Sequence, residues 1–284
     1  MSRLRPESGS RKTSASANPA LTTTQVLRRN GIATSKPGTD VLAVEEPLEI
    51  RVRGRSVAVT MRTPGHDREL AAGFLFTERI IRQRKDLIEI ALCRASSEPE
   101  NTVNVFLAPG VVVDFAQLTR HVFATSSCGL CGKASIESVK QHFPRVDSHL
   151  AVCAKTLLQL PARMRRAQKV FARTGGLHAA AIFDAQGKLI VVREDVGRHN
   201  AVDKVLGFGF LEKMFPFDSH VLLVSGRASF EIMQKALAAR IPMVCAVSAP
   251  TSLAVEFARA SGQALVGFLR GETMNVYAGE ERVR

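Results

Sequence analysis

Cys128 and Cys131 stand three residues apart in the stretch "SSCGLCGKAS", and a glycine follows each of them. Two thiolates at this spacing reach the same side of one helical turn, so they can share a metal, form a redox-active disulfide or carry sulfur as a persulfide. A structural zinc site needs four ligands, and no second CxxC pair or close histidine pair accompanies this one. The residues alone leave the chemistry open, while the glycines favour a thiol on a pliable loop that visits two partners.

The other three cysteines, Cys93, Cys153 and Cys245, stand alone in apolar neighbourhoods. A free cysteine in such a setting usually behaves as a small core hydrophobe. Five cysteines are also an odd number, which argues against a disulfide framework and favours a reducing, cytoplasmic location.

Two short loops combine features that suit phosphate. The stretches "SGRAS" (225–229) and "SAPTS" (248–252) each follow an apolar strand pattern and open a helical one. Gly226 permits close approach of the backbone, Arg227 supplies a guanidinium, and the start of the helix offers free N–H groups beside Ser229. The alternative is that both loops are ordinary helix caps.

The stretch "EDVGRHN" (194–200) holds two carboxylates, a guanidinium, an imidazole and an amide. It forms either a buried ion-pair network, with Asp195 capping the next helix, or a ligand pocket. In the second case His199 could act as a general acid or base, because an imidazole titrates near neutral pH. The glycine turn that ends at His178 adds a second imidazole.

Four segments are expected. Residues 1–40 are predicted to be a disordered basic arm, because they lack a sustained apolar period. Residues 41–120 alternate polar and apolar positions around a hairpin signal at Gly54 and a helical stretch, which indicates a small α+β lobe. Residues 121–135 are the mobile CxxC loop. In 136–284, strands alternate with helices, including one helix over about 155–173, which predicts a parallel sheet with helices on its faces. Ligands bind at the carboxyl ends of such strands.

The net charge of +13 invites a nucleic-acid interpretation, but seven basic residues and one acidic residue fall within the first 39 positions. The chain has no Trp and one Tyr, so it lacks the usual stacking platforms, and we expect no nucleic-acid partner. No apolar run approaches the ~20 residues that span a membrane, so we expect no membrane association.

Five blocks in order, from about residue 41 to 279, resemble the formate dehydrogenase accessory sulfurtransferase family. They are "SSCGLCGKASI", "RTGGLHAAAIF", "REDVGRHNAVDKVLG", "SGRASFEIMQKAL" and "SAPTSLAVEFA". The resemblance implies an α/β fold similar to that of cytidine deaminases, a mixed sheet with helices on both faces, joined to a small N-terminal α+β lobe. It also implies a homodimer. The zinc motif of the deaminases is missing, because His178-Ala179-Ala180 lacks the glutamate and the CxxC pair precedes that histidine. No tightly held metal is expected.

The family's activity would make the chain a sulfurtransferase that takes sulfur from a cysteine desulfurase as a cysteine persulfide. It would pass that sulfur to the molybdenum cofactor, as bis-molybdopterin guanine dinucleotide, before the cofactor enters formate dehydrogenase. Carried over by motif, Cys128 bears the persulfide and Cys131 is its partner. Gly226, Arg227 and Ser229 are candidates to hold the cofactor's phosphates. The family's cofactor-binding stretch falls on Phe268, Leu269, Arg270, Gly271, Glu272 and Thr273. Relatives often carry another basic residue where this chain has Glu272-Thr273. The alternatives are a cofactor-binding chaperone without covalent sulfur transfer and a dithiol oxidoreductase.

Overall fold

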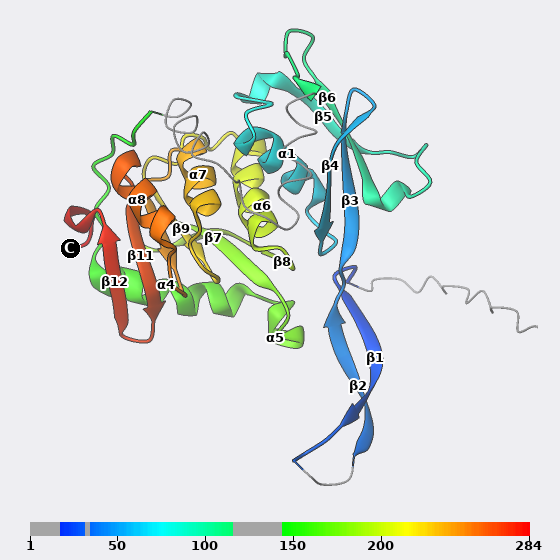
Figure 1. Ribbon diagram of the computed structural model, residues 1–284, viewed down its shortest axis with the longest axis horizontal. Helices are drawn as coiled ribbons and strands as arrows, with labels where there is room; N and C mark the ends of the chain where they lie inside the picture. Colours follow the sequence, from blue (N-terminus) through cyan, green and yellow to red (C-terminus); the bar gives the residue numbers. More distant parts are fainter. Residues whose placement is uncertain (1–17, 32–34, 116–143) are drawn as a thin grey trace, which may run out of the picture.

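The computed structural model describes residues 18–31, 35–115 and 144–284, which form a small lobe, a larger α/β lobe and a projecting ribbon (Figure 1). Cys128, Cys131 and the predicted loop at 121–135 lie outside the described residues. The two lobes lie side by side, with helices α1 and α6 between their sheets.

The small lobe is a four-stranded sheet, within the described residues, covered by one helix. The strand order is β4-β3-β6-β5, with β3 and β4 antiparallel and β3 and β6 parallel. Alternate residues of β3 face the core, as Leu48, Ile50 and Val52 are all buried, so the period of two predicted from the sequence is confirmed. The elements are β3 (Glu46–Val52), β4 (Arg55–Arg62), α1 (Asp67–Thr77), β5 (Leu87–Leu92) and β6 (Thr102–Leu107), with 3-10 turns at Arg84–Asp86 and Pro99–Asn101.

The larger lobe is built on a sheet of six described strands in the order β12-β11-β10-β9-β7-β8, which we call the main sheet. Its strands are β7 (His178–Asp184), β8 (Leu189–Asp195), β9 (His220–Val224), β10 (Met243–Ala246), β11 (Ala264–Arg270) and β12 (Thr273–Ala278). Strands β9, β10 and β11 are parallel, whereas β7 is antiparallel to both of its neighbours and β12 is antiparallel to β11. The sheet is therefore mixed, as the family resemblance implies, and the parallel arrangement predicted from the alternation of strands and helices holds for β9, β10 and β11. Tight turns join β7 to β8 and β11 to β12, and a tight turn can connect only antiparallel strands.

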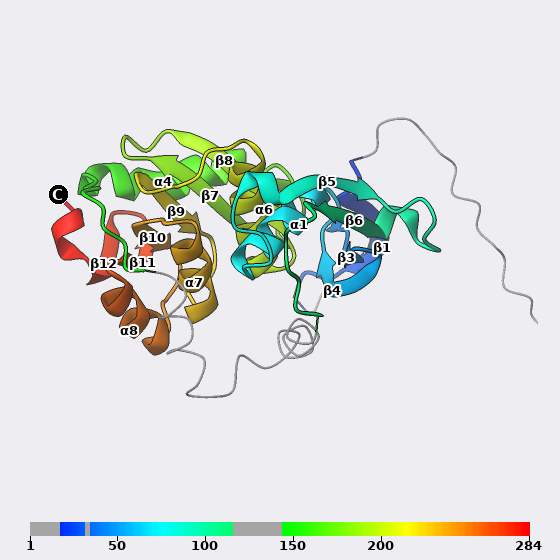
Figure 2. The same ribbon diagram turned by 90° about the horizontal axis from the view of Figure 1, so that it is seen from above.

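Helices cover both faces of the main sheet, as expected (Figure 2). On one face, Leu157, Leu160 and Met164 of α4 pack on alternate sheet residues such as Phe183 and Leu223. The opposite face carries α6, α7 and α8. The helices are α4 (Ala154–Ala167), α5 (Phe171–Thr174), α6 (Arg198–Leu211), α7 (Phe230–Ala238) and α8 (Ser252–Ser261), with a last 3-10 turn at Glu280–Arg282.

The helix predicted over about 155–173 is broken into α4 and α5. The cause lies far along the chain, because the Glu194 carboxylate accepts the backbone N–H groups of Val170 (3.0 Å) and Phe171 (2.7 Å). A carboxylate at these donors starts a new helical turn where local propensity would continue the first helix.

Backbone contact between α1 and α6 joins the two lobes. A Cβ atom added at Gly73 would lie 1.9 Å from the carbonyl oxygen of Asp203, and one added at Gly207 would lie 1.8 Å from that of Glu69. Only glycine permits this approach. The junction therefore holds the lobes in one arrangement.

The prediction of a disordered arm over 1–40 is wrong for its second part. Strand β1 (Leu21–Arg28) pairs with β2 (Lys36–Ala43) in an antiparallel ribbon, from Leu21 opposite Ala43 to Arg28 opposite Lys36. Most of its side chains are exposed, so the sequence analysis was right that little is buried there. Ladder hydrogen bonds and the β-branched run Thr22–Thr24 form the ribbon without a core of its own.

Candidate functional site

The predicted ligand loops meet at one edge of the main sheet, which we call the carboxyl edge. Because β8 and β9 are both antiparallel to β7, the carboxyl ends of β8, β9, β10 and β11 all lie there. Backbone hydrogen bonds join the loops: Ala228 donates to Ala249 (3.2 Å), and Phe268 donates to Ser248 (3.1 Å). The structure thus brings together the 225–229 loop, the 248–252 loop and the 268–273 hairpin.

The 225–229 loop is held against the start of β7. The hydroxyl of Ser225 accepts the backbone N–H of Ala179 at 2.9 Å. A Cβ atom at Gly226 would lie 3.3 Å from Nδ1 of His178, so the backbone passes close to the imidazole. Arg227 is exposed, and the side chain of Ser229 makes no capping hydrogen bond to α7. This loop therefore keeps the glycine, guanidinium and uncapped helix start that suit a phosphate.

The 248–252 loop is an ordinary cap by comparison. The hydroxyl of Thr251 accepts the backbone N–H of Ala254 at 3.3 Å. The carbonyl of Ala228 accepts the backbone N–H of Thr251 at 3.0 Å. This loop supports its neighbour, and the capping alternative holds for it.

The 268–273 stretch is a bulged hairpin between β11 and β12. The pairing register shifts between Gly267 and Arg270, and Phe268 has a φ of 50°. A bulky side chain in the left-handed region is unusual and is found where the surrounding structure requires it. The Arg270 guanidinium lies 5.6 Å from the centre of the Phe268 ring. Leu269 is buried in the core, whereas the residues from Arg270 to Thr273 are exposed.

In the "EDVGRHN" stretch, some polar side chains form a buried network, and others keep polar atoms without a hydrogen-bond partner. The Asp195 carboxylate is fully buried and lies 2.6 Å from Lys204 Nζ. It also accepts the backbone N–H groups of Thr63 (3.2 Å) and Gly197 (2.8 Å). Asn200 donates to the carbonyl of Met61 at 2.7 Å. Asp195 is therefore part of a buried ion pair that ties the small lobe to α6 and does not cap the helix.

Arg198 and His199 are the residues of this stretch that keep such unpartnered polar atoms. Within the described ranges, Nε of Arg198 and Nε2 of His199 are buried and accept or donate no hydrogen bond. His199 Nε2 lies 3.9 Å from Glu231 Oε2. Burial, together with the positive charges of Lys235 and Arg198, lowers the pKa of His199 to about 4. Burial and Arg198 also lower the pKa of His178. Both imidazoles are neutral at pH 7 and present polar nitrogens beside the 225–229 loop.

Sequence reasoning missed two contributors on α7. Lys235 Nζ lies 2.9 Å from both carboxylate oxygens of Asp203, and Glu231 faces His199. Their spacing of four residues, which places both on one helix face, was the available signal. Lys235 and Asp203 form a second buried ion pair, which fixes α7 against α6.

The described residues supply no reactive thiol at this edge. Cys93 and Cys245 are buried, as expected, and burial raises the pKa of Cys245 to about 12. Cys153 is exposed, which corrects the prediction of a core position, because it precedes the first turn of α4. The carboxyl edge presents groups that suit an anion, whereas the two cysteines predicted to carry sulfur, Cys128 and Cys131, lie outside the described residues.

The described residues show neither a metal-binding group nor a membrane-spanning helix. Across residues 18–31, 35–115 and 144–284, no three His, Cys, Asp or Glu side chains are grouped as a metal site would require. The described helices include none with the length and apolar character of a membrane span.

Comparison with known proteins gives a consistent picture. The model of the FdhD/NarQ family matches residues 43–284. The chain is 53% identical over 253 residues to the sulfur carrier protein FdhD of Mycobacterium bovis, covering 86% of this chain and 92% of that protein. It is 52% identical to the sulfur carrier protein FdhD of Streptomyces coelicolor, covering 91% and 94%.

A solved structure also matches. It is a crystal structure from Desulfotalea psychrophila, described as that of a formate dehydrogenase accessory protein, with a TM-score of 0.73 and 24% identity. The match covers 93% of this chain and 98% of that one. At this identity the likeness concerns the fold.

Proposed function

The chain belongs to the FdhD/NarQ family, and from that premise we propose that it is a sulfur carrier for the maturation of formate dehydrogenase. It takes sulfur from a cysteine desulfurase and delivers it to bis-molybdopterin guanine dinucleotide before that cofactor enters the enzyme. The observation that carries the proposal is the meeting of the 225–229 loop and the 268–273 hairpin at one edge, in a chain 53% identical to a sulfur carrier protein.

Sulfur enters by thiol exchange. The Cys128 thiolate attacks the outer sulfur of a persulfide on the donor, the donor's S–S bond breaks, and the donor cysteine leaves as a thiolate. No net oxidation occurs. Cys131 then attacks the inner sulfur of the Cys128 persulfide, which forms a disulfide and releases the outer sulfur as sulfide. In this step the S–S bond of the persulfide breaks as that of the disulfide forms. The electron pair of the broken bond leaves with the outer sulfur as sulfide while the Cys131 thiolate supplies the pair for the new bond, so the electrons balance.

The carboxyl edge supports the cofactor half of the proposal. The backbone around Gly226 and the start of α7 receive one pyrophosphate, and Arg227 and Arg270 pair with its charges. Phe268 presents an aromatic face beside Arg270. The neutral imidazoles of His178 and His199 donate or accept at the same place. The carried cofactor is a substrate here, and the imidazoles proposed to meet it lie beside the buried ion pairs, since His178 pairs with Asp195 across β7 and β8.

The central experiment is Cys128→Ala in cells that depend on this chain for formate dehydrogenase. We expect formate dehydrogenase activity to be lost, because no persulfide can form at that position. Cys153→Ala is the matched control, since this exposed cysteine should be dispensable. Full activity of the Cys128 variant would refute sulfur transfer through this residue.

A cofactor-binding chaperone without covalent sulfur transfer is the second candidate. It is favoured by the carboxyl edge itself, whose described residues suit an anion and include no reactive thiol. Mass spectrometry after incubation with a desulfurase and cysteine separates the two. Added sulfur on the CGLCG peptide supports the carrier, and its absence supports the chaperone.

We also propose that the protein is cytoplasmic and forms a homodimer. Sedimentation velocity is the direct test of the dimer.

A further inference from the structure

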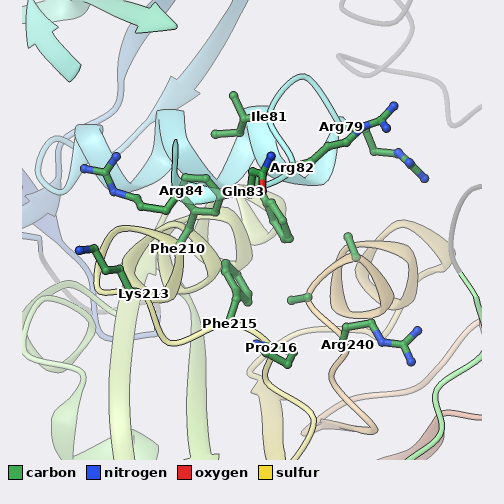
Figure 3. Close-up of a pocket in the computed structure, with 13 residues that line it drawn as sticks. Arg79, Ile81, Arg82, Gln83, Arg84, Phe210, Lys213, Phe215, Pro216 and Arg240 are labelled. Atoms are coloured by element: carbon green, nitrogen blue, oxygen red, sulfur yellow. The ribbon is translucent and has the colours of Figure 1, made fainter. Parts of the chain in front are cut away.

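A cavity lies at the opposite end of α6 and α7 from the carboxyl edge (Figure 3). Its volume is about 480 Å³, within the range of ligand-binding pockets. Its apolar wall includes Phe76, Ile81, Phe210, Phe215 and Pro216. Its basic residues are Arg79, Arg82, Arg84, Lys213 and Arg240. We call this site the basic pocket. The proposed sulfur chemistry and cofactor binding use none of these residues.

Three helices end beside the basic pocket, and a basic residue follows each end in the left-handed conformation. These are Arg79 after α1 (φ 60°), Lys213 after α6 (φ 58°) and Arg240 after α7 (φ 63°). This position usually holds glycine, as Gly262 does after α8. A side chain there carries a steric cost. Attraction to the helix dipole offsets only part of that cost, so the chain places cations here at a net expense.

Four of the five basic side chains of the pocket have no acidic partner within the described residues. Arg82, Arg84, Lys213 and Arg240 have no carboxylate oxygen within 4.0 Å there, and no described lining residue is acidic. Burial and the nearby charge of Arg82 lower the pKa of Arg79. Like charges thus gather on an apolar surface, which favours an anionic occupant.

The arrangement suits an acidic protein segment better than a small anion. Figure 3 shows Arg84 and Lys213 on one side of Phe210 and Phe215, with Arg79 and Arg240 on the other side. One small anion would pair with one or two of these cations. A segment with several carboxylates around an apolar side chain would use both sides and the apolar wall together.

The pocket also lies where the cysteine-bearing segment rejoins the fold. Nη1 of Arg240 donates to the carbonyl of Pro144 at 2.7 Å, and Pro144 is the first described residue after that segment. Segment 116–143 itself holds three basic residues, Arg120, Lys133 and Lys140, against one acidic residue, Glu137. Its own charge therefore repels the basic pocket, so an acidic partner is the better complement.

We propose that the basic pocket docks an acidic segment of the protein that donates sulfur to this chain. An apolar side chain of the donor fills the space at Phe210 and Phe215, and flanking carboxylates pair with Arg82, Lys213 and Arg240. The donor's identity as a cysteine desulfurase rests on the proposed function. Docking at this end leaves the carboxyl edge free for the cofactor.

The test is a calorimetric titration of the full chain with the cysteine desulfurase of the same organism. We expect the Arg82→Glu/Lys213→Glu variant to bind at least tenfold more weakly than the unaltered chain, whose affinity should itself fall as salt rises. Both substituted residues are exposed. Lys169→Glu/Lys188→Glu is the matched control, because it makes the same charge change at two exposed lysines outside the pocket.

Affinity unchanged within twofold in the pocket variant, or an equal loss in the control, would overturn the proposal. Laurate, a small amphipathic anion, is the probe for the alternative occupant. If laurate binds in the pocket and does not weaken desulfurase binding, the pocket holds a small anion, and the proposal is also overturned. If the variant folds poorly, Arg82→Gln/Lys213→Gln gives a milder form of the same comparison. Sulfur on Cys128 is measured separately at saturating desulfurase. Pocket-dependent binding without added sulfur would refute the carrier function and leave docking intact.

Discussion

The two ends of α6 and α7 present different groups to a negatively charged ligand. At the carboxyl edge, the helices begin, and the groups on offer are backbone N–H groups, Gly226 and two neutral imidazoles. At the basic pocket, the helices end, and the groups are long, flexible cations on an apolar wall. Fixed backbone donors suit one rigid phosphate, whereas flexible cations suit the variable carboxylates of a protein partner. The proposed function uses both kinds of surface, because it requires a donor protein and a nucleotide cofactor to meet the chain.

The largest expected effect comes from the buried pair that ties the lobes together. Asp195→Ala leaves Lys204 charged, 1% exposed and without its partner. We expect a loss of about 3–5 kcal/mol in the free energy of unfolding, measured with urea. Glu49→Ala breaks the more exposed pair with Arg51 and should cost at most about 1 kcal/mol. Equal losses of unfolding free energy in the two variants would contradict a larger contribution from the buried pair.

The contact between α1 and α6 should show the next largest effect. Gly207→Ala drives a methyl group against the carbonyl of Glu69, so the helices must separate. We expect a loss of about 1–3 kcal/mol in unfolding free energy and weaker binding at both ends of the helices. Gly110→Ala is the control, because a Cβ atom there would meet no atom within 4 Å. If only one end weakens, the two ends are positioned independently.

Nucleotide binding separates the two ends directly. Removing a guanidinium that pairs with phosphate costs roughly 1.5–3 kcal/mol, so Arg270→Ala and Arg227→Ala should each lower GDP affinity at least tenfold. Isothermal titration with GDP and ADP measures this, with GDP expected to bind more tightly. Lys213→Ala, in the basic pocket, should leave GDP affinity unchanged. No preference for GDP over ADP in the unaltered chain would remove the physical support for the cofactor assignment.

The smallest effect is a difference in pH response. The pKa of His199 is about 4 in the folded chain and near 6.5 when unfolded, so the unfolded state binds more protons between these values. Folding stability should therefore fall as pH drops from about 6.5 to 4, and His199→Gln should remove part of that slope. Urea midpoints at pH 7 and 5 measure it. Lys213→Gln should leave the slope unchanged, because the described lining of the basic pocket has no histidine. An unaltered slope in the His199 variant would contradict the prediction.

Much of the larger lobe could be predicted from its residues. Strands β7 to β11 and helices α6 to α8 follow the expected order, because their apolar periods match the faces they bury. The elements that the sequence did not predict correctly have two causes. The β1–β2 ribbon and β12 bury little, so their patterns are weak, and the break between α4 and α5 depends on Glu194, more than 20 residues away.

The sequence by itself determined the candidate chemistry: the Cys128 and Cys131 pair, the anion-binding loops and the family blocks, all of which are local in the chain. Only the tertiary structure decided which polar groups find a hydrogen-bond partner within the fold and which do not. Asp195 became structural because Thr63, 132 residues earlier, donates to it, while His199 and Arg198 kept polar atoms without partners. It also decided that five cations, three of which follow helix ends, share one apolar pocket. Such outcomes depend on contacts between residues far apart in the chain, which local patterns do not encode.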